Sequence, residues 1–228
     1  MSSTFRPSSL DHVALWVDDR AGLAAFVCDH LGMHVIEETD SFTLVGVDAK
    51  LGKLTLFDAQ GPRERGGLKR VALRADDVES VIERLPVEVE RGEDGVAELD
   101  APAGLRLGLV EREGREFDLD HVVLELTEPE SAAVELERMG FERRDGVLAV
   151  ADRELRLERG QADDRGRPLL NHLALLVDDA QRVKDEANRG GLEVEDVKDA
   201  PNTFAVFLRG PEGLRIEYVE HKPGFALI

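Results

Sequence analysis

The chain contains a single cysteine, Cys28, among its 228 residues. One thiol excludes an intrachain disulfide, and it excludes the zinc and iron–sulfur sites that need several cysteines. Cys28 falls in the apolar pattern of an expected helix. We therefore expect a buried and unreactive thiol, as is usual for free cysteine.

The chain also lacks an apolar run of roughly 18 or more residues, the length needed to cross a bilayer as a helix. The segment from Met1 to Pro7 lacks the apolar core of a secretion signal. Hydrophobic residues make up 42% of the chain, which is enough to form a core. These features predict a globular, cytoplasmic protein.

Basic residues are scarce. The chain has 29 Lys and Arg against 48 Asp and Glu, a formal net charge of -19. Nucleic acids and anionic membrane surfaces both bind through basic patches, so neither is an expected partner. The acidic residues are spread through the whole chain rather than gathered in a tail.

One short phrase occurs four times. Its copies are Leu10–Val17 (LDHVALWV), Leu68–Ala75 (LKRVALRA), Leu119–Leu126 (LDHVVLEL) and Leu170–Val177 (LNHLALLV). The third position holds His12, Arg70, His121 and His172 in turn. A phrase that returns at intervals of roughly fifty residues indicates a repeated supersecondary unit. Histidine at its third position is a candidate metal ligand.

Each copy begins a strand, because its side chains alternate between apolar and other residues. A helix with apolar spacing near 3.6 follows, and three short strands complete the unit. The expected helices span residues 20–31, 77–85, 129–139 and 179–189. Gly32, Gly140 and Gly190 follow three of these helices, as helix ends favour.

Polar, proline- and glycine-containing linkers separate the units at 60–67 and 160–168. The charged segment 111–116 is the best candidate for a boundary between two halves. The sequence therefore predicts a leader at 1–9, an N-terminal half at 10–115 with units 1 and 2, and a C-terminal half at 116–228 with units 3 and 4.

The second and fourth units share another phrase, Pro102–Gly108 and Pro211–Glu217, a turn that leads into a last strand. Four such units, with histidine on the first strand and glutamate on the last, resemble the vicinal oxygen chelate superfamily of glyoxalase I, extradiol dioxygenases and the fosfomycin- and bleomycin-resistance proteins. The resemblance extends from Leu10 to Glu220. It implies an α+β fold in which four βαβββ modules pair into two half-open barrels, and a divalent metal inside a barrel.

Strand alternation places Glu217 on the face opposite Tyr218, and it gives His121, His172 and Glu158 a similar orientation toward a cavity. By resemblance, His121, His172 and Glu217 correspond to the two-histidine, one-carboxylate metal set of extradiol dioxygenases, whose metal also lies in the C-terminal half. Such ligands suit Fe or Mn, which we favour, and also Ni or Zn.

The N-terminal half matches this pattern poorly. It keeps His12, but Phe57, Arg70 and Gly108 occupy the other expected positions. One ligand cannot hold a metal, so this half is expected to be a degenerate partner, with His12 as a hydrogen-bonded polar residue.

Two further residues are predicted to act in catalysis. Glu158 would move a proton or add a fourth ligand, as in glyoxalase I, where each half of the site supplies a histidine and a glutamate. His221 shares the face of Glu217 and is a candidate proton-transfer group.

The favoured function is a dioxygenase-like enzyme whose small-molecule substrate chelates the metal through adjacent oxygens. A glyoxalase-type isomerase or lyase is the alternative, and a metal-free drug-binding protein is the second alternative. The chain is expected to be a monomer or a homodimer.

Overall fold

The computed structural model describes residues 5–49, 52–113, 116–160, 166–223 and 225. It contains all four predicted units. The first has β1 (Ser9–Val17), α1 (Arg20–His30), β2 (His34–Glu38), β3 (Phe42–Gly46) and β4 (Lys53–Asp58). The second has β5 (Leu68–Ala75), α2 (Val78–Ile82), β6 (Val89–Arg91), β7 (Ala97–Asp100), the 3-10 turn η1 (Pro102–Gly104) and β8 (Arg106–Glu111).

The third unit has β9 (Leu119–Leu126), α3 (Pro129–Arg138), β10 (Glu142–Arg144), β11 (Val147–Val150) and β12 (Arg153–Arg159). The fourth has β13 (Leu170–Leu176), α4 (Ala180–Gly190), β14 (Val194–Asp199), β15 (Thr203–Arg209), the 3-10 turn η2 (Pro211–Gly213) and β16 (Arg215–His221). The predicted α+β class with paired βαβββ modules is confirmed.

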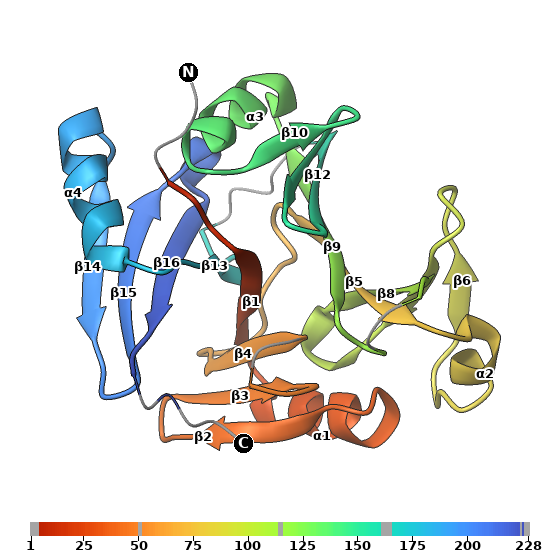
Figure 1. The fold of residues 1–228 in the computed structure, drawn as a ribbon. Helices are drawn as coiled ribbons and strands as arrows, with labels where there is room; N and C mark the ends of the chain where they lie inside the picture. The colour runs from red at the N-terminus through yellow and green to blue at the C-terminus, as the bar shows by residue number, and fades with distance from the viewer. Residues whose placement is uncertain (1–4, 50–51, 114–115, 161–165, 224, 226–228) are drawn as a thin grey trace.

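The strands form two eight-stranded sheets. The first sheet has the order β14-β15-β16-β13-β1-β4-β3-β2 and joins units 1 and 4. The second sheet has the order β10-β11-β12-β9-β5-β8-β7-β6 and joins units 2 and 3. In Figure 1, red β1 runs through the middle of the molecule, between the blue C-terminal strands and orange β4. Each sheet therefore takes one unit from each of the predicted halves, 10–115 and 116–228.

The two predicted linkers join strands of different sheets. The segments 60–67 and 160–168 each connect one sheet to the other, and they meet where Glu64 forms an isolated bridge with Pro168. The segment 111–116, expected as the boundary between halves, instead connects β8 to β9 within the second sheet. Units 2 and 3 are thus adjacent both in the chain and in one sheet, whereas units 1 and 4 pair although the whole second sheet separates them in the chain.

Aspartates that follow the repeated phrase cap three of the helices. The side chain of Asp19 accepts a hydrogen bond from Gly22 N, and Asp77 and Asp179 cap α2 and α4 in the same way. These contacts satisfy amide groups that the first turn of a helix leaves unpaired. Cys28 on α1 is partly buried rather than fully buried.

Alternation along β16 separates the two faces of the first sheet. Ile216 and Tyr218 are fully buried in the main core, and the Tyr218 hydroxyl donates to Met139 O over 2.5 Å. Glu217 and His221 point to the opposite face, which lines a cavity. The side chains of β16 therefore alternate between the two faces of the sheet as the sequence predicts.

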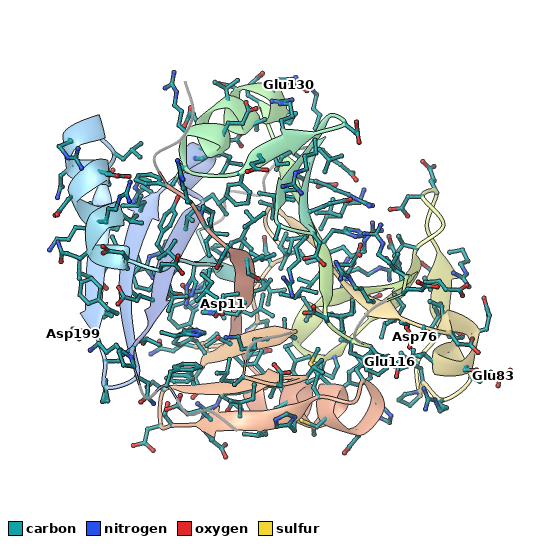
Figure 2. All side chains as sticks on the ribbon, viewed as in Figure 1. Asp11, Asp76, Glu83, Glu116, Glu130 and Asp199 are labelled. Atoms are coloured by element: carbon teal, nitrogen blue, oxygen red, sulfur yellow. The ribbon has the colours of Figure 1, made fainter. Side chains whose placement is uncertain are left out.

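Acidic side chains cover much of the exterior. Of the six acidic residues that Figure 2 labels, Glu83, Glu130 and Asp199 lie at the outline of the view and Asp11 lies inside the molecule; Asp76 and Glu116 are also exposed. Within the part of the chain that the structure describes, no helix is both long and apolar enough to cross a membrane.

Candidate metal centre

Three side chains from neighbouring strands of the first sheet meet on its inner face. They are His12 on β1, His172 on β13 and Glu217 on β16. His12 Nε2 lies 3.2 Å from His172 Nε2 and 3.2 Å from Glu217 Oε2, and His172 Nε2 lies 2.8 Å from that oxygen. The register brings them together, because Ala174 lies between His12 on one strand and Glu217 on the other.

These spacings fit a divalent metal. Nitrogen and oxygen ligands lie at about 2.0–2.2 Å from such an ion, which places neighbouring ligands about 3 Å apart. The three atoms form a triangle with sides of 2.8, 3.2 and 3.2 Å. Two imidazoles and one carboxylate on one face are the ligand set of non-haem Fe(II) sites, which leave other coordination positions open.

Each histidine is held through its other ring nitrogen. His12 Nδ1 donates to Asp11 Oδ2 over 2.8 Å, and His172 Nδ1 donates to Asn171 Oδ1 over 3.0 Å. Hydrogen bonds of this kind fix the tautomer and the ring orientation of a metal-binding histidine. Both Nε2 atoms are thereby directed toward Glu217.

The electrostatics of the three groups are strongly coupled. Burial opposes charge on His12, but hydrogen bonds with Asp11 and Glu217 outweigh it and raise the pKa of His12 to about 9. Burial lowers the pKa of His172 in spite of Glu217. Burial works against ionised Glu217, yet the two histidines hold the pKa of this carboxyl well below its usual range. Glu217 is therefore ionised, as a metal ligand must be.

Asp11 is the hub of a second, buried network. Besides His12, it binds Lys53 Nζ over 2.8 Å, and His221 Nε2 lies 3.4 Å from its carboxylate. Lys53 and Asp11 are each only 2% exposed. This network connects a ligand histidine with His221, the residue that the sequence predicts as a proton-transfer group.

The three ligand atoms face a cavity of about 340 Å³. Its lining includes the aromatic rings of Phe42, Phe57, Phe207 and Phe225. Asp11, Lys53 and His221, which contact one another through Asp11, form a polar wall, and residues 200–203 at the start of β15 also line the cavity. The cavity therefore offers an apolar surface beside a polar one, as small-molecule sites commonly do.

His121 lies elsewhere. The structure brings His172 and Glu217 together, but it places His121 on β9 of the second sheet, where Arg70 donates to its Nε2 over 3.0 Å. His121 Nδ1 donates to Asp120 Oδ2 over 2.8 Å. Burial is the main cause of a lowered pKa for His121, so its imidazole is neutral and accepts from the guanidinium. The cation beside this histidine is thus Arg70.

Glu158 is also distant from the three ligands. It lies on β12 of the second sheet, and its carboxylate binds Lys69 Nζ over 2.5 Å where both side chains are nearly half exposed. Strand parity predicts which face a side chain takes, but it does not predict which sheet the strand joins. His221 does line the cavity, at the end of β16.

The position equivalent to Glu217 in unit 1 is Thr55 rather than Phe57. Thr55 lies beside Ala14 on β1, just as Glu217 lies beside Ala174 on β13. Thr55 and Phe57 both line the cavity. A hydroxyl therefore occupies the place where a fourth, carboxylate ligand would lie.

His12 is the residue that the sequence interpretation undervalued. It carries the same preceding aspartate as His121, in the pairs Asp11–His12 and Asp120–His121. The phrase alone does not distinguish the two. The pairing of units 1 and 4 does, because it places β1 directly beside β13.

The comparisons with known proteins agree with this architecture. Residues 9–126 match the family model of the Glyoxalase/Bleomycin resistance protein/Dioxygenase superfamily. The chain belongs to this superfamily. The resemblance inferred from the repeated phrase is therefore confirmed.

Solved structures of the superfamily fold cover nearly the whole chain. A candidate dioxygenase from Bacillus subtilis is 20% identical, with a TM-score of 0.79 over 97% of this chain and 87% of its own. Glyoxalase I from Zea mays is 17% identical, with a TM-score of 0.74 over 93% of this chain and 92% of the maize chain. The cppA protein of Streptococcus pneumoniae is 15% identical, with a TM-score of 0.63 over 95% of this chain and 100% of the cppA chain. At these identities the likeness shows the fold. No curated protein sequence matches the chain.

Proposed function

We propose that the protein is a divalent-metal-dependent enzyme of the vicinal oxygen chelate type. His12, His172 and Glu217 would hold the metal, and a small substrate would chelate it through two adjacent oxygens. The observation that supports this most directly is the convergence of two Nε2 atoms and one carboxylate oxygen within 3.2 Å of one another, facing a cavity.

When bound, the metal would supply Lewis acidity to the substrate oxygens, and iron or manganese would add redox chemistry with dioxygen. The protein's own groups would then orient the substrate. The aromatic rings of Phe42, Phe57 and Phe207 would pack against its apolar part and exclude water. His221, which lines the cavity and contacts Asp11, would accept or return a proton at its ring nitrogen.

A dioxygenase-like reaction is the favoured activity. Three ligands on one face leave positions for both substrate oxygens and dioxygen, whereas Thr55 supplies no fourth carboxylate. The cavity is also a poor fit for a large dicarboxylate such as a glutathione adduct. Of the described residues that line it, Lys53 is the one lysine or arginine, and Asp11 neutralises it.

A glyoxalase-type isomerase or lyase is the second candidate, and Glu37 is the observation that favours it. This glutamate on β2 lines the cavity opposite the metal-binding strands. A carboxylate so placed could move a proton between two carbons of a metal-chelated substrate. Oxygen consumption separates the two reactions, because the isomerase consumes none.

Metal analysis of protein purified without chelators tests the proposal first. We expect close to one equivalent of a transition metal. Less than about a tenth of an equivalent, with no rebinding of Fe(II), Mn(II), Ni(II) or Zn(II), would refute both enzyme proposals and support a binding protein.

Three single substitutions then identify the ligands. His12→Asn and Glu217→Gln are expected to abolish stoichiometric binding, whereas His121→Asn is expected to retain it. His34→Asn, at an exposed position on β2, is the matched control. Metal loss in His121→Asn and retention in His12→Asn would contradict the site seen in the first sheet.

A further inference from the structure

The chain folds back over the cavity after β16. Lys222 holds this turn, because its Nζ contacts Asp199 and donates to Ala200 O over 2.6 Å, and its backbone N donates to Asn202 O over 2.9 Å. Phe225 N then donates to Lys222 O over 2.9 Å. The end of β16 is thus tied to the β14–β15 turn, which lines the cavity.

This turn places the Phe225 ring against the polar wall. The ring stacks on His221, with centroids 3.8 Å apart and planes within 5°. Lys53 Nζ lies 6.0 Å from its centroid, a distance at which a cation and an aromatic face still attract each other. His221 is left only 16% exposed, so Phe225 covers much of the ring that faces the cavity.

We infer that Phe225, held in place by Lys222, is a specificity-determining residue that limits the size of the molecule the cavity admits. The inference rests on the proposed function, because the admitted molecule would be the metal-chelating substrate. Phe225 lines the cavity beside His221 and Lys53, and residues 200–203, to which Lys222 is bound, line it as well. A substituent that extends away from the chelated oxygens would therefore meet its ring or the β14–β15 turn.

Binding of two probes to the Zn(II)-loaded protein tests this inference. Zinc has no redox chemistry, so a catechol is bound without being oxidised at the site. The probes are nitrocatechol, whose absorbance reports chelation, and a nitrocatechol that carries an added phenyl group. Phe225→Ala is expected to improve the affinity for the bulky probe relative to the compact one by about tenfold, within the range by which apolar pockets discriminate size.

Lys222→Ala should change the affinity ratio in the same direction, since it removes the contacts with Asp199 and Ala200. Lys198→Ala is the matched control, because Lys198 is 67% exposed on β14 and pairs with Asp196. An unchanged ratio in Phe225→Ala would overturn the inference. Absence of nitrocatechol binding in the metal-loaded unmodified protein would instead overturn the proposed function.

A second measurement needs no metal. Diethyl pyrocarbonate modifies accessible histidines, and peptide mass spectrometry reports the rate for each one. His221 should react several times faster in Phe225→Ala and Lys222→Ala than in the unmodified protein or Lys198→Ala, with exposed His34 as internal reference. Equal rates at His221 in all four proteins would show that Phe225 does not cover this wall, and the inference would be wrong.

Discussion

Replacing Lys53 by Met should destabilise the protein strongly. Lys53 Nζ and the Asp11 carboxylate are 2.8 Å apart and each side chain is 2% exposed, so neither charge is solvated. Methionine preserves most of the side-chain volume but removes the lysine cation, so that Asp11 keeps only its contacts with His12 and His221. The substitution therefore isolates the charge interaction from the packing.

The expected cost follows from the burial of the pair. Removing one partner of a buried ion pair typically costs about 3–5 kcal/mol, because the other charge stays buried and unpaired. Asp11 keeps hydrogen bonds to His12 and His221, which favours the lower end of that range. For a chain of this size, about 3 kcal/mol corresponds to a fall in melting temperature of roughly 6–12 °C.

Urea unfolding of the metal-free protein measures the cost directly. Lys198→Met, at an exposed pair, is the control and should cost less than about 1 kcal/mol. Asp11→Asn combined with Lys53→Met should cost less than the sum of the two single changes, because no lone buried charge remains. A loss below about 1 kcal/mol in Lys53→Met would refute the reasoning, since it would mean that the pair is solvated.

The same variant makes a prediction about pH. Burial raises the pKa of Asp11, but Lys53, His12 and His221 more than offset it and hold the pKa well below its usual range. A carboxyl with a lowered pKa contributes stability above its unfolded pKa of about 4, and this contribution is lost as the pH falls through the folded value. The stability difference between the unmodified protein and Lys53→Met should therefore narrow below about pH 4.

Three other substitutions probe the site. Glu158→Gln should leave metal content and activity unchanged, because Glu158 pairs with Lys69 on the second sheet. Loss of metal content or of activity in this variant would mean that Glu158 does belong to the metal site. Asn171→Asp should strengthen metal binding in a competition assay, since a carboxylate raises the basicity of His172 more than an amide does; equal or weaker binding would contradict this. Thr55→Glu should add a carboxylate ligand, so the protein should bind the metal more tightly. The bound metal should then bind nitrocatechol more weakly in a spectrophotometric titration. Unchanged affinities would show that position 55 does not face the metal.

Local sequence patterns predict most of the secondary structure. The copies at Leu10 and Leu170 alternate as strands, and Asp19 and Asp179 begin the helices that follow, because the same backbone chemistry operates in each unit. Local patterns do not predict which units pair in one sheet. Every copy presents a similar edge, so local preferences do not decide whether β13 lies beside β1 or beside β9. The pairing is a tertiary property, and contacts between segments far apart in the chain, such as Glu64 with Pro168, accompany it.

The candidate site was likewise predictable from the sequence only in part. Parity correctly placed Glu217 and His221 on the cavity face of β16, since alternation is a property of the strand alone. It could not choose between His12 and His121 as the partner of His172. Both have an aspartate before the histidine, and both rings are held by it at 2.8 Å. The pairing of β1 with β13 distinguishes them, because β9 belongs to the other sheet.

The second sheet shows what takes the place of a metal when the repeat loses its ligands. Arg70 stands where the other copies have histidine, and its guanidinium lies against His121 Nε2 and contacts Asp94 and Glu98. Gly108 occupies the position of Glu217, and a Cβ there would lie 2.8 Å from Arg70 Cδ. The long arginine thus uses the space that glutamate would need. A fixed cation that is part of the chain thus donates to the buried imidazole of His121, whereas in the first sheet the corresponding histidines, His12 and His172, lie against Glu217.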